Sequence, residues 1–300
     1  MASPIHRQSI APGRLARSAP VSKTACMATL TVAFLGDIFG APGRMVVQQQ
    51  LPSLREEHQP DIIIANAENA KAGSGLTPEL YRKIRGYGVD AITLGDHVYR
   101  DREIISVLQT PDEPISRPAN LSAKAPGRSF IQIQPAGNRT RSLFVITVLG
   151  RVFFNTPADD PFATVDHLLT QLPETNPLVI VEAHMEATSE KIALARYLDG
   201  RVALVVGTHT HVPTADARIL PRGTGFITDL GMCGPYDGII GRDADAVLRH
   251  MTTAVPAPYG VASGGEAMCG VVARIDQPSG RTLSIQRIQY SADRQRPPFV

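Results

Sequence analysis

The chain has 300 residues, of which 43% are hydrophobic and 19% are charged. A chain of this length is expected to form one or two domains with a sizeable core, so folding needs neither a disulfide framework nor a structural metal. The composition excludes a disordered or fibrous protein, and no apolar run approaches the roughly 20 residues that a membrane-spanning helix requires.

The formal net charge of +2 at pH 7 is distributed unevenly along the chain. Residues 1–28 contain three arginines and one lysine without any acidic residue, so removing these four charges from +2 leaves the remainder at −2. The basic surplus therefore does not indicate a nucleic-acid-binding face on the folded part. Aromatic residues make up only 5% of the chain, which provides no stacking platform for long nucleic acid.

The two ends of the chain differ in pattern from the body between them. We predict a disordered basic N-terminal tail over 1–28, a folded domain over 29–292 and a flexible C-terminal tail over 293–300. The N-terminal segment lacks the apolar run of a secretory signal and has little of the amphipathicity of a transit peptide. Because Met27 lies just before the first predicted strand, a dispensable extension or a start codon placed too early is the simplest interpretation, and we expect its deletion to leave activity intact.

The three cysteines favour a reducing compartment. Cys26, Cys233 and Cys269 are odd in number, widely spaced and without a CxxC pair. This usage is typical of reduced thiols rather than disulfides, so we predict a cytoplasmic location.

From residue 29 the chain alternates short β-branched runs with helical segments, a pattern typical of parallel strands joined through helices. In chain order we predict strands at 29–36, 61–65, 91–94, 178–182, 203–207 and 225–229, with candidate strands at 129–134 and 143–148 in a less regular stretch.

Helix signals lie between several of these strands. Helices are predicted from Pro42 to about His58, from the N-cap Thr77 to about Gly86, and over 189–198, where Thr188 and Ser189 have the pattern of an N-cap. Pro52 should end or kink the first helix. The last two runs, 270–275 and 282–288, flank a Pro-Ser-Gly turn and predict a β-hairpin. One α/β domain with an antiparallel edge accounts for this order.

Polar residues that suit metal binding follow five of the predicted strands. They are Gly36-Asp37, Glu68-Asn69, Gly95-Asp96-His97, His184 with Glu186, and Gly207-Thr208-His209-Thr210-His211. One such group alone is explained as a turn or as a buried core histidine. Five groups at successive strand ends, which contain four of the eight histidines of the chain, are not explained in this way. Because the carboxyl ends of parallel strands face one crevice, the side chains are expected to converge. Histidines at i and i+2 together with several oxygen ligands predict a hydrolytic site with two metals.

A series of longer motifs extends this pattern over nearly the whole body. They are GDIFGAPGR (36–44), NAENAKAGSGLT (66–77), ITLGDH (92–97), RPAN (117–120), AHMEATSEK (183–191), GTHTHVPTAD (207–216) and ITDLGMCGPYDGIIG (227–241). In this order they resemble the calcineurin-like metallophosphoesterases, and within them the YmdB-type cyclic-nucleotide phosphodiesterases. The resemblance implies a single-domain, four-layered α/β/β/α sandwich with two divalent or mixed-valence metal ions, iron or manganese.

The resemblance also implies roles for individual residues. Asp37, Glu68, Asn69 and His211 would hold one ion, and Glu68, Asp96, His184 and His209 the other, so Glu68 would bridge them. Two ions about 3.5–4 Å apart lower the pKa of a shared water to near neutrality, which makes a metal-bridging hydroxide the expected nucleophile. His97 is the expected catalytic residue, protonating or stabilising the leaving oxygen. The alternative is that His97 only orients Asp96.

Position 96 departs from the Gly-Asn-His pattern of the family, because this chain has Asp. The extra negative charge is expected to tighten binding of a divalent ion while making that ion a poorer Lewis acid. Lower turnover or a changed metal preference is the resulting hypothesis. It fails if Asp96→Asn alters neither the metal content nor the rate.

The predicted function is a metal-dependent phosphodiesterase that hydrolyses small phosphodiesters. The family resemblance implies cyclic nucleotides as the substrate class. A phosphomonoesterase of the same fold and a slow-turnover, metal-binding regulatory protein remain alternatives, the second prompted by Asp96. A serine hydrolase is disfavoured because no Gly-x-Ser-x-Gly motif is present. The expected partner is a small phosphodiester, without a membrane or an extended nucleic-acid surface. Relatives in the family commonly assemble, so a homo-oligomer is an expectation.

Two further segments have two interpretations each. Arg117 suits either a phosphate contact or a structural ion pair. Residues 234–238, Gly-Pro-Tyr-Asp-Gly, have the composition of a turn that either is structural or touches substrate.

Overall fold

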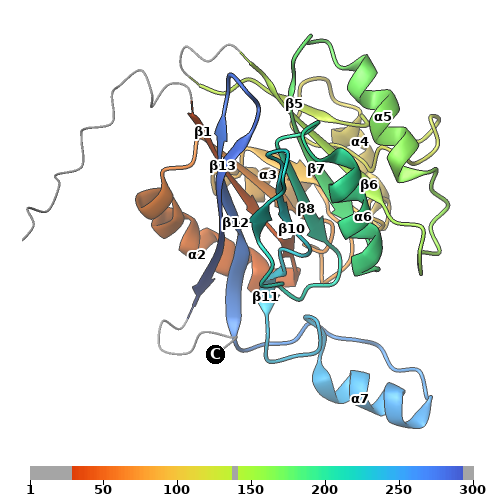
Figure 1. Ribbon diagram of the computed structural model, residues 1–300. Helices are drawn as coiled ribbons and strands as arrows, with labels where there is room; N and C mark the ends of the chain where they lie inside the picture. Colours follow the sequence, from red (N-terminus) through yellow and green to blue (C-terminus); the bar gives the residue numbers. More distant parts are fainter. Residues whose placement is uncertain (1–28, 137–140, 293–300) are drawn as a thin grey trace, which may run out of the picture.

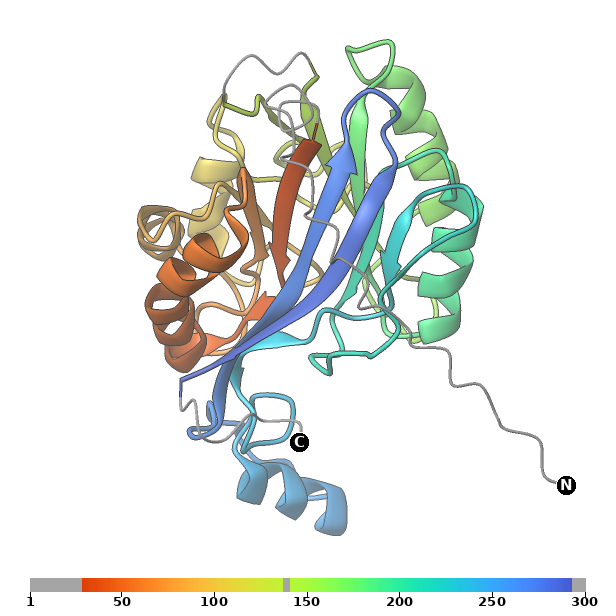
Figure 2. The same cartoon turned by 60° about the vertical axis from the view of Figure 1, so that its left-hand side comes forward.

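Two β-sheets lie face to face at the centre of the structure, and helices cover the outer face of each (Figure 1; Figure 2). The computed structural model describes residues 29–136 and 141–292. The predicted tails at 1–28 and 293–300 lie outside the described residues. The four-layered arrangement implied by the family resemblance is confirmed.

The first sheet has seven strands and contains both ends of the described chain. Its order is β2-β11-β12-β1-β3-β4, and β13 pairs with the other edge of β12. The neighbours β1, β3 and β4 run parallel, whereas β12 is antiparallel to β1. The strands are β1 (Thr29–Leu35), β2 (Asp37–Ile38), β3 (Ile62–Asn66), β4 (Ala91–Thr93), β11 (Met232–Pro235), β12 (Glu266–Asp276) and β13 (Thr282–Ser291).

The second sheet has six strands in the order β5-β6-β7-β8-β10-β9. Its four central strands, β6, β7, β8 and β10, run parallel. The strands are β5 (Ile131–Ile133), β6 (Leu143–Leu149), β7 (Leu178–His184), β8 (Leu204–Thr208), β9 (Arg218–Ile219) and β10 (Gly225–Ile227). The strand-helix alternation predicted the parallel strands but not their division between two sheets. The chain crosses from the first sheet to the second in the irregular stretch between β4 and β5, where no repeating pattern marks the change.

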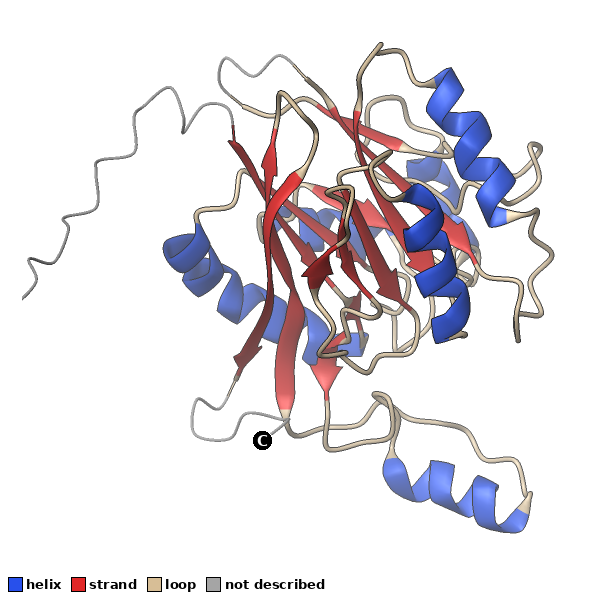
Figure 3. Cartoon of the chain, in the orientation of Figure 1, coloured by secondary structure: helices blue, strands red, loops and turns tan. Residues whose placement is uncertain are grey.

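Helices lie on the outside of the two layers of strands (Figure 3), and the helices of the two outer layers come from different parts of the sequence (Figure 1). The first sheet is covered by helices from the first third of the chain, and the second sheet by α5 and α6. The helix α7 projects away from both sheets at the end of an excursion between β11 and β12 (Figure 1). The helices are α2 (Gly40–His58), α3 (Pro78–Gly86), the 3-10 turn η1 (Arg102–Ile104), α4 (Ile105–Leu108), α5 (Pro161–Gln171), α6 (Thr188–Leu198) and α7 (Ala244–Thr253).

Local sequence signals explain some helix boundaries and not others. Thr77 caps α3 as predicted, because its side chain accepts a hydrogen bond from the Leu80 amide. α2 continues through Pro52 to His58, and this is possible because Pro52 and Gln48 are exposed, so water can satisfy the carbonyl that loses its partner. The predicted N-cap at Thr188 and Ser189 is wrong, because α6 begins after Ala187 without a side-chain cap.

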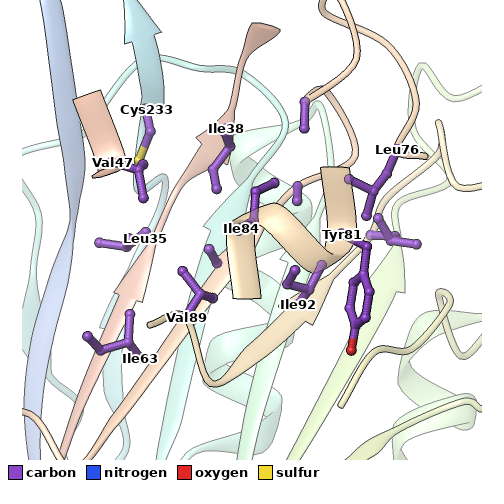
Figure 4. Close-up of a cluster of buried hydrophobic side chains, with 14 of the residues drawn as sticks. Leu35, Ile38, Val47, Ile63, Leu76, Tyr81, Ile84, Val89, Ile92 and Cys233 are labelled. Atoms are coloured by element: carbon purple, nitrogen blue, oxygen red, sulfur yellow. The ribbon is translucent and has the colours of Figure 1, made fainter. Parts of the chain in front are cut away.

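Three apolar clusters separate the four layers. The first lies between the first sheet and α2 and α3, and includes Leu35, Val47 and Ile84 (Figure 4). The second lies between the sheets, and the third lies between the second sheet and α5 and α6. Because β1 is buried on both faces, Leu35 enters the first cluster and Phe34 the second.

Two remaining predictions concern the described residues. Cys233 and Cys269 are buried free thiols, as predicted. Within residues 29–136 and 141–292, none of the helices combines the length and apolar character required to span a bilayer.

Candidate metal centre

The polar groups predicted after the strands converge at the carboxyl ends of both sheets. The first sheet contributes the carboxylates and the amide, and the second contributes three imidazoles. The first sheet supplies Asp37 after β1, Glu68 and Asn69 after β3, and Asp96 and His97 after β4. The second sheet supplies His184 at the end of β7, and His209 and His211 after β8. All eight predicted site residues therefore lie in one region.

Four of these residues form a compact group. Glu68, Asp96, His184 and His209 each offer one ligand atom, and these atoms lie within 4.8 Å of one another. His184 Nε2 is at the centre, 3.2 Å from Glu68 Oε1 and 3.1 Å from Asp96 Oδ1. His209 Nδ1 lies 3.2 Å from the same nitrogen. Two carboxylates and two imidazoles suit a divalent ion such as iron, manganese or zinc.

The other predicted group is arranged around Asn69. Its amide nitrogen lies 3.4 Å from Asp37 Oδ1, 3.3 Å from Glu68 Oε1 and 3.2 Å from His211 Nε2. Its amide oxygen lies 2.7 Å from His97 Nδ1. The oxygen and nitrogen of an amide are assigned from such contacts, and a metal ligand would need the opposite orientation, with the oxygen facing Asp37 and His211.

The electrostatics of this region favour a cation. Burial raises the pKa of Asp37 to about 7, and the nearby Glu68 carboxylate adds to the effect. Burial alone would lower the pKa of His184, but the charge of Glu68 and the hydrogen bond to Asp96 outweigh it and hold this pKa well above its ordinary value. Positive charge is therefore most stabilised where Glu68, Asp96 and His184 meet, and the donor set fits a bound metal ion.

A glycine allows His184 to reach this position. A Cβ atom at Gly95 would lie 2.2 Å from His184 Nε2, so the imidazole packs directly against the backbone of the loop after β4. This contact joins the two sheets at the site. It explains why glycine precedes Asp96 and His97.

A buried carboxylate orients His184 from behind. The Thr208 hydroxyl donates to Glu182 Oε1 at 2.8 Å and lies 2.9 Å from His184 Nδ1. Glu182 is fully buried and also accepts hydrogen bonds from Asn66 and Thr147. Because the hydroxyl proton is directed to Glu182, the hydroxyl oxygen accepts from His184 Nδ1, which leaves Nε2 available to a metal.

A buried ion pair anchors the loop that bears the other two histidines. His209 and His211 both have left-handed backbone conformations, with φ of 93° and 66°. Between them, the Thr210 hydroxyl donates to Asp229 Oδ2 at 2.7 Å, and Lys191 Nζ lies 2.6 Å from the same oxygen. Such conformations cost of order 1–3 kcal/mol each in residues other than glycine. The Lys191–Asp229 pair therefore supports a strained loop.

A cavity of about 330 Å³ opens beside these groups. His97 lies on its wall with 24% of its side chain exposed. Arg242 also lines the cavity, where its guanidinium stacks 4.9 Å from the centre of the Phe39 ring and donates to the Gly73 carbonyl at 2.6 Å. The lining residues are Phe39, Glu68, Asn69, Gly73, His97, Glu186, His209, Thr210, His211, Ile240 and Arg242.

Sequence reasoning missed several of these wall residues. Phe39 lies inside a motif that carried the family resemblance, and Arg242 follows another by one residue, but neither belongs to a pattern that indicates a role. Glu186 was noted after its strand but not predicted as a ligand, and its Oε2 lies 3.2 Å from His209 Nε2. Arg117 lies outside this cavity and donates to the carbonyls of Pro118 and Ala125, so its role is structural but is filled by backbone carbonyls rather than by the predicted ion pair.

Comparison with known proteins places the chain in one family. A family model described as YmdB-like protein matches residues 33–288. The chain belongs to the YmdB-like family. The matched range includes every residue of the candidate metal centre.

Individual YmdB-like relatives match over most of their length. A 2',3'-cyclic-nucleotide 2'-phosphodiesterase of Bacillus subtilis is 42% identical over 265 residues, covering 88% of this chain and 98% of that protein. The crystal structure of a hypothetical protein from Thermus thermophilus is 40% identical with a TM-score of 0.81, covering 87% of this chain and 99% of that one. A structure described as a novel phosphatase from Mycoplasma pneumoniae is 30% identical, also with a TM-score of 0.81, covering 88% and 94%.

Proposed function

We propose that this YmdB-like protein is a metal-dependent phosphodiesterase that acts on small phosphodiesters, with nucleoside 2',3'-cyclic phosphates as its substrate class. The observation that carries the proposal is the convergence of seven ligand-type side chains beside a cavity of about 330 Å³. The substrate class rests on the activity named for the Bacillus subtilis relative. A cytoplasmic, reducing location is part of the proposal and rests on the cysteine usage.

Two metal ions, iron or manganese, would be held by the residues assigned above. Asp37, Glu68, Asn69 and His211 would hold one, and Glu68, Asp96, His184 and His209 the other. When bound, such ions activate water and neutralise charge on the phosphoryl oxygens. The protein contributes the fixed positions of these side chains, because Glu182 and the Lys191–Asp229 pair orient the histidines.

His97 is the residue we assign to the leaving group. In the reaction a P–O bond forms to water, the bond from phosphorus to the 2'-oxygen breaks, and this oxygen takes up a proton to leave a nucleoside 3'-phosphate. The ring of His97 is held through Nδ1 by Asn69, and its backbone amide donates to Glu68 Oε2 at 2.9 Å. With the Asn69 amide turned as a metal ligand requires, its nitrogen donates to His97 Nδ1, so Nε2 carries the proton and is the nitrogen available to deliver it. General acids of this kind contribute roughly 10²- to 10⁴-fold to the rate.

The test is hydrolysis of adenosine 2',3'-cyclic phosphate by chelated protein and by protein reloaded with manganese or iron, with the two possible monophosphate products separated. We expect metal-dependent formation of the 3'-phosphate and little hydrolysis of that product. His97→Ala should lower turnover by about 10²- to 10⁴-fold while keeping the bound metal. His167→Ala, which removes an exposed histidine of α5, is the matched control.

Other outcomes would support the alternatives. Hydrolysis of monoesters without hydrolysis of the cyclic diester would indicate a phosphomonoesterase. Two bound metal ions per chain without turnover of either substrate would indicate a metal-binding regulatory protein. Loss of bound metal in His97→Ala, with the rate restored by excess metal, would show that His97 only orients Asp96. An unchanged rate with metal retained would exclude both roles.

A further inference from the structure

A second cavity, of about 190 Å³, lies at the other end of the second sheet from the candidate metal centre. Its walls come from the segments before β7, β8 and β10 and from the turn between β12 and β13. In Figure 1 this turn is at the upper end of the molecule, whereas the arrowheads of β7 and β8 point the opposite way. Four arginines line the cavity, namely Arg141, Arg201, Arg222 and Arg281. We call this cavity the arginine pocket.

The backbone of the arginine pocket is shaped around its arginine side chains. A Cβ atom at Gly200 would lie 2.7 Å from Cβ of Arg222, and one at Gly223 would lie 2.8 Å from Cγ of Arg281. Both glycines have positive φ, 81° and 104°, so any other residue would be strained as well as crowded. The stems of Arg222 and Arg281 therefore pack directly over backbone.

Arg141 is held in place by carbonyl groups. Its guanidinium donates to the carbonyls of Asn176 at 2.7 Å and Pro177 at 3.1 Å, and also to that of Gln277. Burial lowers the pKa of Arg141, opposed by the charges of Glu174 and Asp276. These contacts fix the position of the guanidinium without a carboxylate hydrogen bond to neutralise it.

The charges around the arginine pocket are unbalanced. No aspartate or glutamate is among its lining residues. Arg201 is paired with Asp166 at 2.6 Å, but the structure shows no ion pair between Arg141, Arg222 or Arg281 and a carboxylate of residues 29–136 or 141–292. Asp199 lies nearby and accepts the backbone amide of Arg222 at 3.0 Å rather than its guanidinium. The lining therefore carries three arginines without an ion pair to a described carboxylate, and the charges of Glu174 and Asp276 act on Arg141 from outside the lining.

We propose that the arginine pocket binds the phosphate group of a small ligand, either inorganic phosphate or a phosphomonoester. Guanidinium groups match the geometry of phosphate oxygens and form paired, charge-assisted hydrogen bonds with them. A phosphate would supply the negative charge that the lining residues of the pocket lack. The site is distinct from the candidate metal centre, and it does not depend on the function proposed above.

Isothermal titration of metal-free protein with inorganic phosphate tests the proposal, because chelation removes the metals that would draw phosphate to the other site. We expect saturable binding of one phosphate per chain with a dissociation constant of about 1 mM or below at low salt, equivalent to about −4 kcal/mol. Arg222→Gln with Arg281→Gln should weaken binding by tenfold or more. A parallel titration with ribose 5-phosphate distinguishes the two ligands. If ribose 5-phosphate binds more tightly than inorganic phosphate, the ligand is a phosphomonoester; if the two dissociation constants are equal, it is free phosphate.

Two controls make the result specific. Arg274→Gln with Arg287→Gln removes two exposed arginines of β12 and β13 outside the pocket, and should leave binding unchanged. Asp37→Asn alters the candidate metal centre and should also leave it unchanged. The proposal is overturned if no saturable binding occurs, if Arg222→Gln with Arg281→Gln binds normally, or if either control weakens binding as strongly. The four substituted arginines, Arg222, Arg274, Arg281 and Arg287, are all exposed. We therefore expect both double variants to have the unfolding temperature of the unmodified protein.

Discussion

The two sheets supply different halves of the candidate metal centre, and they hold their side chains in different ways. The first sheet places Asp37 at the start of β2 and Glu68 and Asp96 in the loops after β3 and β4, none of them with a positive φ. The second places His209 and His211 in left-handed conformations and surrounds its histidines with buried charged groups. The carboxylates thus follow from the ends of the strands, whereas the imidazoles depend on additional buried supports.

The reason for the difference lies in what each side chain must do. A carboxylate offers two oxygens and accepts bonds over a wide range of directions. An imidazole offers one nitrogen in the ring plane, and the proton on the other nitrogen has to be placed. The supports behind the second sheet, Glu182 and the Lys191–Asp229 pair, serve that requirement. The predictions below test this comparison, beginning with the largest expected effect.

Replacing the residue that touches both halves should have the largest effect. Glu68 contacts His184 from the second sheet and the His97 amide and Asn69 from the first. We expect Glu68→Gln to lower metal affinity and turnover by more than the roughly 10- to 100-fold typical of residues that only orient ligands. Bound metal measured after dialysis and turnover measured with excess metal test this. Glu56→Gln on the exposed face of α2 is the control, and equal metal content in the two variants would contradict the role of Glu68.

Breaking the buried ion pair should affect the fold as well as the site. Lys191→Met leaves Asp229 buried and unpaired, so we expect the free energy of unfolding to fall by about 3–5 kcal/mol. Adding Asp229→Asn should restore part of the loss, because the remaining charge is removed. Urea unfolding of the single and double variants measures both effects. If Lys191→Met unfolds like the unmodified protein, the pair does not support the histidine loop.

Two threonines bound to the same carboxylate separate orientation from packing. Thr208 links Glu182 to His184, whereas Thr147 donates to Glu182 at 2.8 Å without contacting a histidine. We expect Thr208→Val to weaken metal binding by roughly 10- to 100-fold, and Thr147→Val to change it much less. Metal titration of both variants provides the comparison. Equal losses would mean that Glu182 acts through packing alone.

The smallest expected effect concerns Asp216, in the segment after the two histidines. Partial burial acts to raise its pKa, but hydrogen bonds from Thr228 and Thr214 outweigh it and hold the pKa below the ordinary value. A carboxyl whose pKa is lowered by folding stabilises the folded state at pH values above its pKa in the unfolded chain, which is about 4. This stabilisation is lost as the pH falls through the pKa of the same group in the folded state. Asp216→Asn should therefore be less stable than the unmodified protein at pH 7, and the difference in unfolding temperature should shrink below pH 4. A constant difference over that range would exclude this linkage.

Much of the fold could be predicted from local patterns, and the failures have physical causes. The strands β1, β3, β7 and β8 are apolar runs bounded by polar residues, so periodicity was sufficient to find them. The helix α5 was not predicted, although Asp160 and Pro161 form a recognisable start, with the Asp160 side chain accepting from the Phe162 amide. The helix α7 was missed because its buried surface is small, with Val247 as its only buried residue.

The sequence by itself determined which residues end the strands, and hence the identity of the predicted ligands, because that choice depends on the order of apolar and polar residues along the chain. Tertiary structure alone decided how they meet. Lys191 and Asp229 are separated by 38 residues, and Arg141 and Gln277, which meet in the arginine pocket, by 136. No local pattern encodes such contacts, because they exist only once α6 has packed on the second sheet and the two sheets have packed against each other.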